Sequence, residues 1–205
     1  MRRLGIRLPS IRRVGVGGDS LSEAACSEIL SVFDGADCLM NVYAMTEAMA
    51  IVCSPSMHSG RGTDVGFPVP SAQIKVVDEE TGHRLGANQT GEICFRIPTI
   101  MKEYYQRPKE TADLFDEESW CKSGDAGYYD DDGRLHIVQR LKEMIKCMDQ
   151  QVIPAEIENL LLEEHLEEIS EVAVVGLPHP HYGQSPAAAV VLRSQPRGQD
   201  TRSLG

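Results

Sequence analysis

The most informative absences in this 205-residue sequence concern membrane segments and paired cysteines. No apolar run approaches the roughly 18 residues that a transmembrane helix needs, and the N-terminus has no apolar signal core. The cysteines form no C-x-x-C pair; they are Cys26, Cys38, Cys53, Cys94, Cys121 and Cys147. This spacing predicts reduced, mainly structural thiols in an intracellular protein. The chain ends in Ser203-Leu204-Gly205 rather than the S-K-L peroxisomal address. The expected location is intracellular, in the cytoplasm or the peroxisome.

Positive charge is scarce: 20 Lys and Arg stand against 31 Asp and Glu, and the net charge is −11. A nucleic-acid-binding surface needs a basic stripe to meet phosphate, so this balance argues against one. The basic cluster "MRRLGIRLPSIRR" at residues 1–13 is interpreted as solvated charge rather than as a binding arm. The sequence has neither a dinucleotide-binding G-x-G-x-x-G nor a hydrolase elbow. His179 and His181 lie two apart without a third candidate ligand nearby, so we predict no metal site there.

Residues 12–52 have the pattern of a strand, a helix and a second strand. A short apolar stretch leads into Gly17-Gly18, and "SEAACSEILSVF" then repeats apolar residues at helical spacing after a cap at Ser20 or Ser22. The stretch "ADCLMNVY" returns as a strand. Strand, helix and strand in this order predict one piece of an α/β layer.

Residues 60–139 have the pattern of a strand-rich subdomain. Apolar and polar residues alternate over Gln73–Val77 and Glu92–Ile97, and turn residues separate the two runs. A further hairpin is expected with its tip at 131–133, where the sequence reads Asp-Asp-Gly.

The pattern changes again after residue 139. Pro154 fits the first turn of an amphipathic helix, two apolar strands are expected at 169–178 and 185–194, and 195–205 is a polar tail. The sequence thus predicts an α/β fold with a strand-rich subdomain. The expected parts are 1–59, 60–139 and 140–205.

Thr46 and Glu47 lie side by side in "NVYAMTEA", and two interpretations stay open at this point. Thr46 is a good helix N-cap and Glu47 suits a first turn, in which case the helix continues through Ile51. Alternatively, the hydroxyl and the carboxylate bind a ligand together.

Seven blocks in this order resemble the adenylate-forming superfamily of acyl-CoA synthetases, 4-coumarate–CoA ligases and related luciferases. The resemblance covers about residues 11–193, and its blocks are "VGGDSL", "VYAMTEA", "DVGFPVP", "TGEICFR", "WCKSGDAGYYDDDGRLHIVQRLKEMIK", "VIPAEIENLL" and "VAVVGLPHPHYGQSPAAAVVL". It implies a partial adenylate-forming fold: part of the large N-terminal AMP-binding domain followed by part of a small α+β C-terminal domain. It also implies an acid–CoA ligase with ATP, AMP, Mg²⁺, coenzyme A and a carboxylic acid as ligands. Such a ligase forms an acyl-adenylate first and a thioester second.

The resemblance assigns roles to individual residues. Thr46 is expected to bond the α-phosphate, and Glu47 to hold Mg²⁺, a cation that prefers oxygen ligands. Asp125 is expected to accept hydrogen bonds from the ribose hydroxyls, with Arg140 assisting. Without the resemblance, Asp125 would be interpreted as a turn residue. The other expected nucleotide contacts are Gly17 and Gly18, where backbone approaches closely, and Tyr43, which flanks the adenine ring.

The segment 139–149 resembles the hinge at which the small domain rotates between the two half-reactions. Gln139 lies at this hinge, and Lys142 and Lys146 lie four residues apart, on one face if the segment is helical. Two interpretations of these lysines stay open: they help to place coenzyme A, or they lie on a solvated face.

Several positions depart from the family pattern, and two of its blocks are missing. Ala44 and Glu103 stand in place of glycines, Ser123 in place of threonine, Gln139 in place of an acidic residue or lysine, and Asp149 in place of a loop glycine. Neither the phosphate loop nor the C-terminal catalytic lysine is found. From these absences we expect a fragment that catalyses poorly by itself, and a non-catalytic nucleotide- or partner-binding fragment is the alternative.

Overall fold

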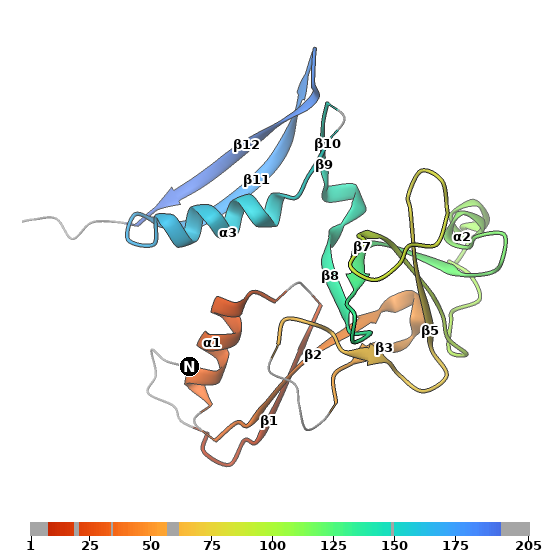
Figure 1. The fold of residues 1–205 in the computed structure, drawn as a ribbon, viewed down its shortest axis with the longest axis horizontal. Coiled ribbons are helices and arrows are strands. Elements are labelled where there is room, and N and C mark those ends of the chain that lie inside the picture. The colour runs from red at the N-terminus through yellow and green to blue at the C-terminus, as the bar shows by residue number, and fades with distance from the viewer. Residues whose placement is uncertain (1–7, 19–20, 34, 57–61, 149, 194–205) are drawn as a thin grey trace, which may run out of the picture. The chain divides into compact units, whose positions relative to one another are not determined.

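The computed structural model describes residues 8–18, 21–33, 35–56, 62–148 and 150–193. Asp149, Ser20 and the polar tail from 195 lie outside these residues. The chain divides into two compact units, Met1–Leu141 and Lys142–Gly205. Each unit is described by itself below, and Figure 1 labels its elements.

The first unit begins with a strand, helix and strand, as the sequence predicts. Strand β1 (Arg13–Gly17) runs parallel to β2 (Cys38–Met45), and helix α1 (Glu23–Val32) connects them. The helix begins where Ser22 accepts a hydrogen bond from the Ala25 N–H at 3.2 Å, which is the N-cap that its short hydroxyl favours. The helix packs its buried Cys26 inward.

Beyond β2 the chain makes one 3₁₀ turn, η2 (Thr46–Ala48), and then reverses. Met49 takes a left-handed conformation with φ of 52°, and β3 (Ala50–Ser54) pairs antiparallel with β2. The interpretation of residues 46–51 as a helix is therefore wrong. The residues after the reversal form a strand in which the adjacent side chains of Val52 and Cys53 are both buried in the core.

The first sheet has the order β1-β2-β3-β4. Its last strand, β4 (Phe67–Pro68), lies within the sequence range assigned to the strand-rich subdomain. The second sheet has the order β5-β6-β7-β8 and is antiparallel throughout. Its elements are β5 (Gln73–Val77), β6 (Gly91–Arg96), β7 (Cys121–Tyr129) and β8 (Leu135–Arg140), with helix α2 (Pro108–Leu114) between β6 and β7. The strands and the hairpin tip expected from alternation are confirmed here.

The main core of the first unit unites both sheets. Its largest fully buried side chains include Phe95, Leu135 and Val52, which come from β6, β8 and β3. The six cysteines are free thiols, as expected. Burial raises the pKa of Cys53, Cys94 and Cys121 to about 12, so these thiols are inert packing groups.

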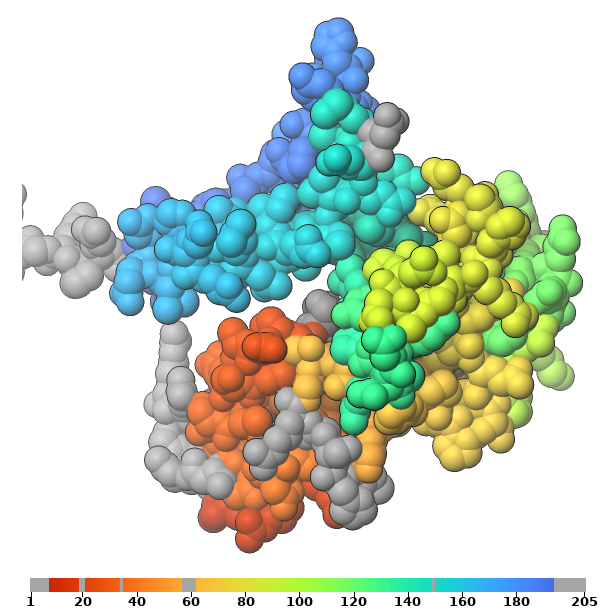
Figure 2. Space-filling model, viewed as in Figure 1, coloured from red at the N-terminus to blue at the C-terminus, as the bar shows by residue number. Residues whose placement is uncertain are grey.

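The second unit is a four-stranded sheet of order β10-β9-β12-β11 with one helix. Its elements are η3 (Leu141–Glu143, which straddles the division), β9 (Ile145–Cys147), β10 (Gln150–Val152), α3 (Pro154–Glu164), β11 (Ile169–His179) and β12 (Gly183–Leu192). Helix α3 begins at Pro154, as predicted, and Glu158 accepts the Val174 N–H of β11 at 2.7 Å. In Figure 2 the tip of the β11–β12 hairpin forms a narrow blue projection of this unit.

No helix among the described residues is both long enough and apolar enough to cross a bilayer. His179 and His181 lie at the β11–β12 tip of this unit. His179 stacks on Tyr182 with ring centroids 4.2 Å apart, and no group of three potential metal ligands occurs in the described part of the chain.

A partly buried ion pair at the edge of the second sheet makes the first unit sensitive to acid. Lys75 donates to Asp116 at 2.6 Å, and its ammonium lies 5.0 Å from the ring centre of Trp120. Burial alone would raise the pKa of Asp116. Hydrogen bonds from Lys75 and from the Trp120 and Glu118 N–H groups outweigh it, so the pKa lies below its usual value.

A folded-state pKa below the unfolded value means that Asp116 contributes stability above the unfolded pKa and loses it as pH falls through the folded one. We expect the free energy of unfolding to decline below about pH 4, the usual range of an aspartate. The variant Asp116→Asn should be less stable at pH 7 and should show a shallower decline. Urea unfolding at several pH values tests this, with Asp132→Asn at the exposed hairpin tip as the control. Parallel declines for Asp116→Asn and wild type would refute it.

Candidate functional site

Two glycines and a polar turn lie at the same edge of the first sheet. Gly17 ends β1 opposite Val42 of β2, and Thr46 and Glu47 follow directly after β2. Because the two strands are parallel, their carboxyl ends meet at one edge, where α/β sheets bind ligands. A Cβ at Gly17 would lie 2.8 Å from the Val42 carbonyl oxygen, whereas one at Gly18 would meet nothing within 4 Å. Gly18 instead has a φ of +100°, which only glycine adopts readily.

Asp125 is a buried carboxylate at the centre of the second sheet, 6% exposed. The Tyr43 hydroxyl of β2 donates to its Oδ2 at 2.6 Å. Arg140, which lies opposite Asp125 in the β7–β8 register, places its Nε 3.2 Å from Oδ1. The Tyr43 bond joins Asp125 to the strand that ends in Thr46 and Glu47. The candidate nucleotide residues of the two sheets are thereby linked.

Tyr43 is a buried residue whose hydroxyl is bonded to Asp125. Its side chain belongs to the main core and is only 8% exposed. Burial, followed by the negative charge of Asp125, raises the pKa of Tyr43 well above its usual value. Tyr43 is therefore a protonated hydrogen-bond donor that holds Asp125 in place.

Side chains replace the regular ladder bonds just before Asp125. The Asp125 N–H donates to Ser123 Oγ at 3.0 Å, and the Gly124 N–H donates to Glu92 Oε1 at 3.2 Å. Gly124 has a φ of +71°, which accounts for a glycine in "SGD". Burial raises the pKa of Glu92. Serine in place of the family's threonine retains the hydroxyl that this turn uses.

Glu47 is half-buried and bonded to a residue that the sequence did not single out. The Tyr104 hydroxyl donates to Glu47 Oε1 at 2.5 Å. Burial, together with this bond and the charge of Glu47, raises the pKa of Tyr104 to about 12. Thr46 is exposed at the same turn. The only sequence signal for Tyr104 is its place directly after Glu103, which stands where the family pattern has a glycine.

An open groove of about 740 Å³ borders these residues on the second sheet. Its lining comprises Glu79, Glu92, Tyr104, Arg107, Glu110, Asp113, Leu114, Lys122, Ser123, Gly124 and Leu141. The groove therefore reaches both the turn before Asp125 and the tyrosine that holds Glu47.

The three residues predicted at the hinge lie in three different elements. Gln139 is half-buried in β8 opposite Ala126. Lys142 and Lys146 are exposed in the second unit, in a 3₁₀ turn and in β9 respectively. The segment is not an α-helix, so the condition under which the two lysines would share one helix face does not hold. The chain folds this segment into a short strand because Ile145 packs into the core and Cys147 and Ile145 pair with β10.

Comparison with known proteins gives consistent matches along the chain. A sequence model described as "AMP-binding enzyme" matches residues 3–105, and one described as "AMP-binding enzyme C-terminal domain" matches residues 156–204. The protein "4-coumarate--CoA ligase-like 2" of Arabidopsis thaliana is 40% identical over 188 residues, covering 91% of this chain and 33% of that protein. "Luciferin 4-monooxygenase" of Photinus pyralis is 39% identical over 186 residues, covering 90% and 33%.

A solved structure shares the fold. ATP-bound MatB from Rhodopseudomonas palustris matches with a TM-score of 0.79 and 28% identity, covering 87% of this chain and 35% of that one. The chain spans about a third of the length of these relatives.

Proposed function

This chain belongs to the AMP-binding enzyme family, as its seven sequence blocks predicted, and on this premise we propose that it supplies the nucleotide site of an ATP-dependent carboxylic acid–CoA ligase. One observation carries the proposal: the buried Asp125 carboxylate is fixed by Tyr43 and Arg140 and is linked through β2 to the polar turn at Thr46 and Glu47. Buried carboxylates need hydrogen-bond donors, and the hydroxyls of a ribose are donors of the kind that a carboxylate accepts. The ATP-bound state of the related MatB supports a nucleotide as the ligand.

In this proposal the two ribose hydroxyls donate to Asp125, and Arg140 orients the carboxylate. Arg140 has a side chain that is 55% exposed, so it can also reach the ligand. The edge of Tyr43 borders the adenine while its hydroxyl holds Asp125.

The phosphate end of the nucleotide lies at the turn after β2 in this proposal. Thr46 donates its hydroxyl to an α-phosphate oxygen, and Gly17 and Gly18 leave room for the nucleotide and the acyl group. Both glycines are exposed at the sheet edge, where they present bare backbone.

The donor set at the turn fits Mg²⁺ but does not form a complete protein cage. Glu47 offers one hard carboxylate, and no group of three acidic, histidine or cysteine side chains gathers elsewhere in the described residues. Mg²⁺ is usually held by one or two carboxylates together with substrate phosphates and water. We therefore assign Glu47 as its protein ligand. When bound, the ion supplies positive charge that offsets the negative charge of the phosphates.

The reaction has two displacements. A carboxylate oxygen of the acid attacks the α-phosphorus of ATP, and pyrophosphate leaves to give an acyl-adenylate. The sulfur of coenzyme A then attacks the acyl carbon, AMP leaves, and the thiol proton is released. The residues of this chain bind and orient the nucleotide, which lowers the entropic part of the barrier. Gln139, Lys142 and Lys146 are proposed to act at the hinge, where the two lysines screen the phosphates of coenzyme A.

Binding of ribose-modified nucleotides tests the proposal. We expect AMP to bind the full chain and 2′,3′-dideoxy-AMP to bind about tenfold or more weakly, since charged hydrogen bonds contribute about 1.5–3 kcal/mol. Isothermal calorimetry without metal measures both affinities. Equal affinities would contradict the role given to Asp125.

A further inference from the structure

Tyr104 has no role in the proposal above, although its hydroxyl is bonded to Glu47. We infer that Tyr104 is the positioning residue for Glu47, and that its hydroxyl occupies one carboxylate oxygen and leaves the other for the cation. The inference rests on the proposed role of Glu47 as the metal-binding carboxylate.

The first support is the direct contact. The phenol donates to Glu47 Oε1 at 2.5 Å, and the Glu47 carboxylate accepts no other hydrogen bond from the described residues. A lysine or arginine in this place would neutralise the carboxylate. The neutral phenol fixes its direction and leaves its negative charge available to a cation.

The second support is that the same segment also binds the backbone of the turn. The Met101 N–H donates to the Glu47 carbonyl at 2.8 Å, and Thr99 Oγ1 donates to the Ala48 carbonyl at 2.7 Å. Residues 99–104 thus hold the turn at three points. Two of the bonds hold the backbone, and the bond from Tyr104 is the one that orients the carboxylate.

The third support is that Tyr104 itself is fixed. Its N–H donates to Thr111 Oγ1 at 3.0 Å, and Thr111 in turn donates to the Arg107 carbonyl at 2.7 Å. The first turn of α2 therefore anchors the tyrosine. A carboxylate held by an anchored donor has fewer orientations to lose when it binds a cation.

The test compares Tyr104→Phe with the neighbouring Tyr105→Phe in the full chain. Tyr105 is 86% exposed and accepts one hydrogen bond, from Gln106. Calorimetry measures how much Mg²⁺ strengthens ATP binding, and how tightly AMP binds without metal. Tyr104→Phe should reduce the Mg²⁺ enhancement of ATP binding about tenfold, which is the lower end of the usual effect of losing a residue that orients a metal ligand. Its metal-free AMP affinity should equal that of wild type, and Tyr105→Phe should change neither quantity.

Glu47→Gln separates this inference from the proposed function. It should abolish the Mg²⁺ enhancement and keep metal-free AMP binding. If it does so while Tyr104→Phe keeps the full enhancement, the positioning role is overturned and the nucleotide site stands. If Glu47→Gln keeps the enhancement, the metal role of Glu47 is wrong, and the inference about Tyr104 fails with it.

If Tyr104→Phe does not fold, as judged by circular dichroism, Thr111→Val replaces it. This variant removes the anchor of Tyr104 but keeps the phenol. It should lower the Mg²⁺ enhancement severalfold with unchanged metal-free AMP affinity, and a full enhancement would overturn the inference.

Discussion

AMP binding to the full chain should weaken by about tenfold to a hundredfold when Asp125 is replaced by alanine. The substitution removes the carboxylate that is proposed to accept both ribose hydroxyls, and hydrogen bonds to a charged group contribute about 1.5–3 kcal/mol. The side chain of Arg140, the ion-pair partner of Asp125, is more than half exposed. Water can therefore solvate Arg140 when the ion pair is lost. Calorimetric titration with AMP in metal-free buffer gives the affinity directly.

The same substitution also affects stability, which the measurement has to separate from binding. Asp125→Ala leaves the buried Tyr43 hydroxyl without its acceptor, at a cost of about 1–3 kcal/mol. Affinities should therefore be measured well below the unfolding transition of each variant. Asp132→Ala is the matched control, because Asp132 is an exposed aspartate at the tip of the same β7–β8 hairpin. A folded Asp125→Ala chain with wild-type AMP affinity would sink the assignment.

The sequence predicted those parts of the fold that depend on local periodicity. The alternation over Gln73–Val77, the helical spacing before Val32 and the proline at residue 154 each identify an element that the structure contains. Local pattern failed at Met49. Its left-handed conformation reverses the chain, although methionine is a good helix former and gives no turn signal.

The candidate site is built from contacts between distant parts of the chain, which periodicity does not report. Tyr43 and Asp125 are separated by 82 residues and Glu47 and Tyr104 by 57. The blocks of family resemblance identified Asp125 and Glu47 by their residue type, but they did not indicate which side chains hold them. The bond from the Gly124 N–H to Glu92 and the bond from Tyr104 to Glu47 depend on the packing of segments that are distant in the sequence.

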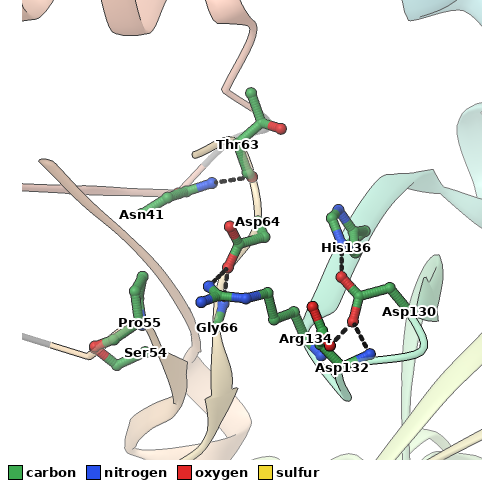
Figure 3. Close-up of polar contacts among 10 residues, drawn as sticks. All are labelled: Asn41, Ser54, Pro55, Thr63, Asp64, Gly66, Asp130, Asp132, Arg134 and His136. Carbon is green, nitrogen blue, oxygen red and sulfur yellow. Dashed lines mark hydrogen bonds and ion pairs between the residues drawn. The ribbon is translucent and has the colours of Figure 1, made fainter. Parts of the chain in front are cut away.

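Gly66→Ala should destabilise the first unit by about 3 kcal/mol or more, through a left-handed backbone and a close backbone approach combined. Gly66 has a φ of +72°, and an added Cβ would lie 2.3 Å from Pro55 N and 2.4 Å from the Ser54 carbonyl oxygen. Figure 3 shows Gly66 beside Ser54 and Pro55, with Asp64 accepting hydrogen bonds from both Gly66 and Arg134. Backbone atoms cannot move aside as a flexible side chain does, so the whole segment would have to shift.

The shift would reach β8, because Leu135 donates its N–H to the Gly66 carbonyl at 2.8 Å. Gly82→Ala is the matched control: its φ is +69°, and an added Cβ there meets nothing within 4 Å. That variant should lose only the cost of a left-handed alanine, about 1 kcal/mol. Urea unfolding of both variants tests the difference. Equal losses would mean that the backbone conformation alone explains the glycine in "DVGFPVP". A larger loss at Gly66 would mean that the close approach of this residue to Ser54 and Pro55 also requires glycine there.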